Sequence, residues 1–145
     1  MDHALRGQYE MGIVQALSAG FVSVPGALLK HYKRLKLNEL DVMLLLHLHY
    51  FQEREHNHFP TWEDLGARMA ASPEQIAASL QRMLKQGILQ IDEEIDAESG
   101  VRSERYNLTP VYARLAEVME PFADAAAGRP APVTAAEGTA ARAGR

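Results

Sequence analysis

The sequence predicts a mainly α-helical domain that carries one small β-hairpin, and three consecutive features predict it. Thr61 and Ser72 each begin a helix, the first with an acidic residue three positions on and the second with proline at the first helical position. Gly87 ends the second helix. Residues 88–95 and 101–108 then have strand character and flank a turn. Helix, turn, helix and hairpin, in that order, form a winged helix-turn-helix.

Within the predicted helix pair the apolar residues recur at helical spacing, which predicts a shared core face. They are Trp62, Leu65, Met69, Ile76, Leu80, Met83 and Leu84. Trp62 has two interpretations: it caps the core, which its place in the first turn favours, or it anchors an interface, as tryptophans often do.

The N-terminal part adds a helix and a strand to this unit. Residues 2–18 carry an apolar stripe at four-residue steps, which predicts an amphipathic helix that Gly20 ends. Residues 21–24 are β-branched or aromatic and precede a proline, which predicts a short strand. Its partner is either the hairpin of the same chain or the same strand of a second chain. An unpaired strand and a terminal apolar helix favour self-association, with candidate residues Leu5, Tyr9, Ile13, Phe21, Val22 and Val24.

Two helices are predicted between this strand and the helix pair. Pro25 begins the first, which runs to about residue 34 with Leu28, Leu29 and Tyr32 facing inward. Its exposed cations bind phosphate as a possible nucleic-acid-binding cluster, pair with an acidic partner, or form a solvated face, and they are Lys30, Lys33, Arg34 and Lys36. Asn38 caps the second helix, residues 39–54, which is apolar on nearly every face and therefore central to the core or partly in a subunit interface.

The chain ends in a helix and a polar tail. Thr109 and Pro110 begin the helix, which has an inward side of Val111, Leu115, Val118 and Phe122. We therefore divide the chain into an N-terminal helix at 1–20, a folded domain at 21–122 and a tail at 123–145. The tail is rich in alanine, glycine and proline, so we expect it to be disordered.

Composition excludes several classes of function. The 145 residues include no cysteine, so disulfides and thiolate chemistry are excluded, and no apolar run reaches membrane-spanning length. A cytoplasmic protein is expected. His47 and His49 point about 200° apart on one helix and cannot chelate one ion, while His56 and His58 have no evident third ligand. With no phosphate loop and no nucleophile motif, we expect neither an enzyme nor a bound cofactor or metal.

Charge argues against DNA reading by the helix pair. The formal net charge is -4, and the predicted hairpin carries six acidic residues against two arginines. Such a hairpin would repel a backbone with about one charge per 1.7 Å of duplex axis. Direct DNA reading by Gln75, Ser79 and Arg82 is therefore the alternative, and a protein-binding surface is favoured. The candidate partner-binding residues are Trp62, Arg68, Gln75, Ser79 and Arg82.

Several short pieces of sequence, in their order and spacing, carry a family resemblance. They are Val24-Pro25 with Leu28-Leu29 and His31-Tyr32, then Leu37-Asn38-Glu39, Phe59-Pro60-Thr61, KQGIL at 85–89, and Tyr106-Asn107-Leu108 with Pro110. Over residues 20–115 the chain resembles the N-terminal domain of the DnaD family of replication-initiation and primosome proteins. The resemblance implies a winged-helix domain that self-associates and docks on the initiator DnaA, ahead of DnaB-family proteins and helicase loading.

The sequence also departs from that family. DnaD proteins usually continue into a second helical domain that binds DNA and ends in an aromatic motif with tryptophan, whereas Trp62 is the only tryptophan here. DNA remodelling is therefore not inferred, and DNA binding is expected to be weak and non-specific at most. The hypothesis is a non-enzymatic primosome scaffold. The alternatives are a winged-helix DNA-binding regulator or plasmid-type initiator, and a truncated relic without independent activity.

Overall fold

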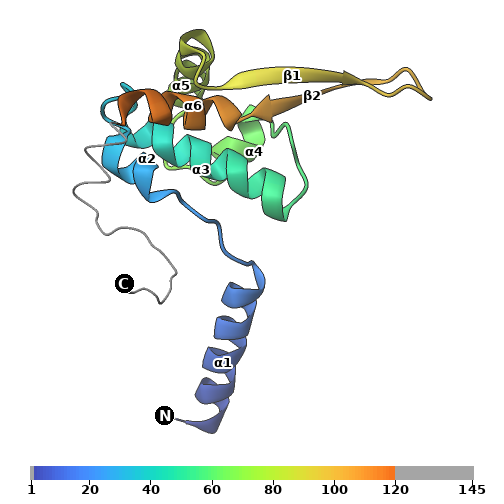
Figure 1. Ribbon diagram of the computed structural model, residues 1–145. Helices are drawn as coiled ribbons and strands as arrows, with labels where there is room; N and C mark the ends of the chain where they lie inside the picture. Colours follow the sequence, from blue (N-terminus) through green and yellow to red (C-terminus); the bar gives the residue numbers. More distant parts are fainter. Residues whose placement is uncertain (1, 120–145) are drawn as a thin grey trace, which may run out of the picture.

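The computed structural model describes residues 2–119, which are mainly helical with one two-stranded antiparallel hairpin (Figure 1). The elements in order are α1 His3–Ser18, α2 Gly26–His31, α3 Glu39–Arg54, α4 Trp62–Gly66, α5 Pro73–Gln86, β1 Gln90–Ile95, β2 Arg102–Asn107 and α6 Thr109–Val118. The predicted order of helix, turn, helix and hairpin is present, and the winged-helix classification itself stays a prediction. None of the helices among residues 2–119 has the length and apolar character needed to cross a membrane.

Three helices begin with a reciprocal capping box, each at an N-cap residue that the sequence predicts. In α4 the Asp64 amide donates to the Thr61 hydroxyl at 3.0 Å, and the Thr61 amide donates to the Asp64 carboxylate at 2.9 Å. Ser72 with its third following residue forms the same box at α5, and Asn38 does so at α3. Each box satisfies two backbone donors that a helix start leaves open.

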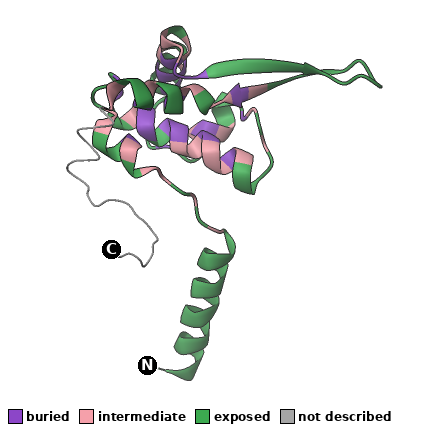
Figure 2. Ribbon diagram, in the orientation of Figure 1, coloured by how far each residue is buried: buried purple, intermediate pink, exposed green. Residues whose placement is uncertain are grey.

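The core forms around α3. Leu44 and Leu48 of this helix are fully buried, and they pack in one apolar cluster with Ile76 and Met83 of α5 and with Leu115 of α6. Figure 2 shows the buried positions concentrated on α3 and α5. The prediction that the 39–54 helix is central to the core is confirmed.

The hairpin is held at its base and free along its length. Its register runs from Gln90 opposite Asn107 to Ile95 opposite Arg102. At the base, the Tyr106 ring stacks on the Phe59 ring with centroids 4.6 Å apart. All of β1 and the outer half of β2 are exposed, and the hairpin projects from the body as an arm (Figures 1 and 2).

Helix α1 stands apart from the rest of the protein (Figure 1). None of its residues is buried. The connection to the body runs through residues 19–25, where the Tyr50 hydroxyl of α3 donates a hydrogen bond to the Ala19 carbonyl at 2.7 Å. The helix predicted at 2–18 is confirmed, but the predicted amphipathic stripe is wrong, because the apolar side chains are spread around most of the helix. They have no partner within the described chain.

The predicted strand at 21–24 is wrong for the single chain. These residues have no regular secondary structure, and β1 pairs only with β2. The intrachain pairing fails because both hairpin strands lie in the arm, away from this segment (Figure 1). An extended backbone without a partner strand has no ladder hydrogen bonds to define it.

Three side chains or boundaries also differ from the prediction. Helix α2 ends at His31 instead of near residue 34, because residues 32–36 form a turn that buries Leu35. Leu29, predicted to face inward, is 59% exposed. Trp62 is 51% exposed, so it does not cap the core as the favoured interpretation expected. The prediction for Phe122 and for the 123–145 tail falls outside the described residues.

Gly87 is expected to be required for the turn between α5 and the hairpin. Its φ of +76° is left-handed, a conformation that costs a residue with a Cβ about 1–2 kcal/mol. Gly87→Ala should lower the free energy of unfolding by about that amount in urea denaturation. Gly66→Ala is the matched control, since nothing lies within 4 Å of its added Cβ. Equal stabilities for the two variants would contradict a requirement for glycine at position 87.

Candidate protein-interaction surfaces

A buried carboxylate ties the second helix of the pair to the centre of the core. Asp41 is 0% exposed, and its Oδ2 accepts a hydrogen bond from the Asn38 amide at 2.9 Å. Its Oδ1 accepts from the Ser79 hydroxyl at 2.5 Å and forms an ion pair with the Arg82 guanidinium. A carboxylate removed from water needs such partners, so α3 and α5 are held in one register at this point.

This network changes the interpretation of the predicted contact residues on α5. Ser79 is 1% exposed and donates to Asp41, so its prediction as a surface contact is wrong. Arg82 is partly exposed, and its charge is paired with the same carboxylate. The Gln75 side chain accepts from the Ser72 amide at 2.9 Å as part of the helix cap. The three side chains proposed to read DNA, Gln75, Ser79 and Arg82, therefore all make contacts within the protein that hold α5 in place.

Arg68 and Trp62, the two predicted partner-binding residues on the α4 side, differ in the side-chain surface that they leave for a partner. Arg68 pairs with Glu55 at 2.8 Å, and its guanidinium carbon lies 4.0 Å from the centre of the Phe51 ring. This hydrogen bond lowers the pKa of the Glu55 carboxyl below its usual value. Trp62, by contrast, exposes half of a large apolar ring. Of the predicted partner-binding residues, Trp62 presents the apolar surface that typically anchors an interface.

The N-terminal candidates form a second exposed apolar surface. Among them, Phe21 is the most exposed, at 78%, and Leu5, Tyr9 and Ile13 are also exposed. Val22 lies in an open apolar groove together with Met43, Leu46, His47, Tyr50 and Arg68. The structure therefore brings part of the predicted self-association segment against the outer face of α3.

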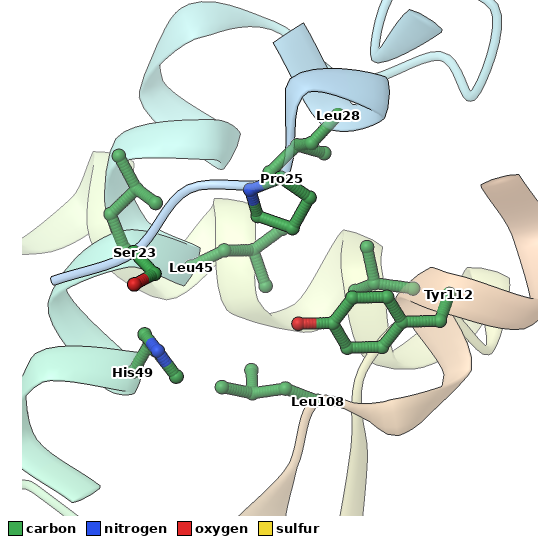
Figure 3. Close-up of a pocket in the computed structure, with 9 residues that line it drawn as sticks. Ser23, Pro25, Leu28, Leu45, His49, Leu108 and Tyr112 are labelled. Carbon is green, nitrogen blue, oxygen red and sulfur yellow. The ribbon is translucent and has the colours of Figure 1, made fainter. Parts of the chain in front are cut away.

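A small pocket lies on the other side of the same segment (Figure 3). Its floor is apolar, and Ser23, His49 and Tyr112 lie around it, with the Tyr112 hydroxyl pointing toward the pocket. The volume is about 40 Å³, whereas pockets for small molecules and cofactors usually measure about 300–1,000 Å³. The pocket can take the tip of one apolar side chain. No cluster of three potential metal ligands occurs within residues 2–119.

The predicted basic cluster is exposed and free. Lys30, Lys33, Arg34 and Lys36 are all exposed, and within the described part of the chain none of them forms an ion pair. Glu39 follows them in sequence, but its carboxylate accepts a hydrogen bond from the Tyr32 hydroxyl at 2.5 Å. The four charges are therefore available to an anionic partner.

Two features of these surfaces are not predicted from the sequence. The link from Asp41 to Ser79 spans 38 residues, a contact that no local pattern encodes. Nothing in the sequence marked His49 and Tyr112 as neighbours either. The one available signal was that an aspartate at the third helical position often completes a capping box.

The chain is similar in sequence to a known protein family. The profile of the DnaD N-terminal domain matches residues 24–124. DnaD of Bacillus subtilis (strain 168), described as a replicative helicase loading/DNA remodeling protein, is 35% identical over 101 residues, which are 70% of this chain and 43% of that protein. The chain thus matches less than half of the length of that relative.

A solved structure agrees with the profile. The crystal structure of the N-terminal domain of DnaD protein from Geobacillus kaustophilus HTA426 is similar with a TM-score of 0.62 and 31% identity, covering 81% of this chain and 94% of that one. The mainly helical fold with its hairpin is therefore consistent with the fold of that domain.

Removing the buried carboxylate should destabilise the protein. Asp41→Ala leaves the buried Ser79 hydroxyl without its acceptor and removes the partner of Arg82, whose side chain is 40% exposed and can reach water, so the expected loss is about 1–3 kcal/mol. Chemical denaturation followed by circular dichroism measures the loss. The control is Glu93→Ala on the exposed arm, expected to stay within about 0.5 kcal/mol of the parent. A similar loss for both variants would refute a special role for Asp41.

His47 should make folding stability depend on pH. Burial, and secondarily the positive charge of Arg68, lower the pKa of His47 below its ordinary 6.5, so the unfolded chain takes up its proton first. The contribution of neutral His47 to the stability of the folded state is complete above pH 6.5 and is lost as the pH falls toward the lowered pKa. His47→Gln should therefore flatten the dependence of the unfolding free energy between about pH 7 and 5. An unchanged slope would count against this origin.

Proposed function

The chain belongs to the DnaD family, through the N-terminal domain of that family, and we propose that it acts as a non-enzymatic scaffold in bacterial replication initiation. Family membership supports the process, because the B. subtilis relative is a replicative helicase loading/DNA remodeling protein. The match involves 43% of that relative's length. DNA remodelling, as an activity of the whole relative, is therefore left out of the proposal.

The first part of the proposal is self-association through α1 and the segment that follows it. The observation that carries it is a 16-residue helix with no buried residue. Its large exposed apolar side chains, together with that of the next segment, are Leu5, Tyr9, Met11, Ile13, Val14, Leu17 and Phe21. Exposed apolar side chains in such number typically mark an interaction site, and a second copy supplies the same side chains.

The second part is docking on the initiator DnaA, followed by recruitment of DnaB-family proteins, in the cytoplasm. We assign the docking face to the α4 side, because Trp62 is exposed there. A half-exposed tryptophan resembles the anchor residues of protein interfaces. In this proposal the winged-helix arrangement serves as a protein-docking platform.

The alternative is a winged-helix DNA-binding regulator or plasmid-type initiator. The observation that favours it is the exposed cluster of Lys30, Lys33, Arg34 and Lys36, which forms no ion pair with any other residue of the described 2–119. Against it, the Arg82 charge on α5 is already paired with Asp41, and the hairpin is acidic. Measuring duplex affinity at low salt distinguishes the alternative, since phosphate contacts give a steep salt dependence.

Charges placed among the exposed apolar residues of α1 should weaken self-association. Leu5→Glu with Ile13→Glu would bury two carboxylates in the proposed interface, so the dissociation constant should rise at least about tenfold. Analytical ultracentrifugation of the full chain measures it. Gln8→Glu with Gln15→Glu is the matched control, because it adds the same charge to exposed polar positions of the same helix. Equal dissociation constants for the two variants would contradict self-association through α1.

Truncation of Trp62 should weaken DnaA binding without unfolding the domain. Loss of an interface anchor of this kind costs about 2 kcal/mol or more, which is roughly a thirtyfold change in affinity. Surface plasmon resonance with immobilised DnaA compares Trp62→Ala with Tyr112→Ala, another exposed aromatic, on α6. If only Tyr112→Ala lowers the affinity, the docking face lies elsewhere.

A further inference from the structure

The acidic excess of the described chain is concentrated in the hairpin, which we call the acidic arm (residues 90–107). It carries Asp92, Glu93, Glu94, Asp96, Glu98 and Glu104 against Arg102 and Arg105, a net charge of -4. The rest of residues 2–119 is balanced between acidic and basic residues. The arm also exposes apolar side chains near its tip, Ile95 and Val101.

An opposite charge is concentrated at the end of α2, in a surface that we call the basic turn (Leu29, Lys30, Lys33, Arg34 and Lys36). Its four cations carry a net +4 and form no ion pair within residues 2–119. The backbone is well defined, because the Lys36 amide donates to the Lys33 carbonyl at 3.1 Å and buried Leu35 anchors the turn. Leu29 adds an exposed apolar side chain beside the cations.

The two surfaces cannot meet within one chain. Figure 1 shows α2 on the opposite side of the body from the tip of the hairpin. The base of the arm is fixed, because Tyr106 is buried against Phe59 and its amide donates to the His58 carbonyl at 3.0 Å. The negative charge of the arm and the positive charge of the turn therefore lie on opposite sides of the body, where each can contact a different molecule.

We propose that the acidic arm of one copy docks on the basic turn of a second copy. Charges of -4 and +4 match in magnitude, and each surface places apolar side chains beside its charges, Ile95 and Val101 on the arm and Leu29 on the turn. Complementary potentials of this kind select and orient partners. A nucleic acid would offer the turn phosphate charge, but its phosphate backbone provides no apolar side chain to cover Leu29.

The contact is head-to-tail, so it leaves one free arm and one free turn on every pair. Such heterologous contacts close into rings or extend into filaments. This inference deepens the proposed scaffold function, and it uses surfaces separate from α1. The two contacts also differ in chemistry: the arm–turn contact weakens with salt, since the screening length falls from about 10 Å at 0.1 M to about 3 Å at 1 M, whereas the apolar α1 contact persists.

Charge reversal in the full chain tests the proposal. The turn-reversed variant carries Lys30→Glu, Lys33→Glu, Arg34→Glu and Lys36→Glu, and the arm-reversed variant carries Glu93→Lys, Glu94→Lys, Glu98→Lys and Glu104→Lys. Sedimentation velocity at 50 mM and 500 mM NaCl measures assembly, and circular dichroism checks folding. Each variant alone should lose the salt-sensitive assembly step by at least about tenfold. An equimolar mixture should regain it, because opposite charges then face each other again.

The controls separate this contact from the one through α1. Leu5→Glu with Ile13→Glu should leave the salt-sensitive step in place, so failure of the α1 contact and failure of the arm–turn contact give different results. Replacing the same four turn residues by glutamine provides a milder variant, which should weaken the step without reversing it. Salt-sensitive assembly that survives both reversals, or a folded mixture that does not regain it, overturns the proposal. So does a turn-reversed variant that assembles normally but no longer binds duplex DNA, which would identify the turn as a nucleic-acid surface.

Discussion

The arrangement of the domain depends on the buried carboxylate of Asp41. It completes the cap of α3 through the Asn38 amide and holds α5 through Ser79 and Arg82. Because α5 leads directly into the hairpin through Gly87, the direction of the acidic arm follows from the position in which this carboxylate fixes α5. Apolar packing supplies most of the stability of a core like this one, and a polar contact with one geometry selects the register.

The same contact bears on function. A helix pair of this shape suggests DNA reading, but Arg82 is the charge that such reading would use, and here it is neutralised from within the protein. What remains for partners is spatially separated: an apolar helix at one end, a half-exposed Trp62 on the α4 side, an acidic arm and a basic turn. An exposed strand edge can pair with strands of other chains and cause aggregation. The charges along the arm disfavour such pairing and still allow a cationic partner to bind. Separate surfaces of this kind are compatible with the proposed scaffold role.

The sequence was most informative where the determinants are local. Caps at Asn38, Thr61 and Ser72, and the left-handed stop at Gly87, depend on residues within a few positions of each other, and the structure contains all of them. The sequence failed where the outcome depends on distant partners. Residues 21–24 have strand propensity but no strand to pair with, and the exposure of Leu29 and Trp62 depends on which helices cover them. The burial of Ser79 was likewise unpredictable, because its acceptor lies 38 residues away.

We propose that this chain assembles with itself and does not act as an isolated domain. The most direct measurement is the mass of the unmodified full chain in solution, by sedimentation equilibrium over a wide range of concentration. The account predicts a concentration-dependent mass above the 16.1 kDa of one chain, with part of the assembly remaining at high salt. A constant mass of 16.1 kDa up to the highest concentration would contradict it.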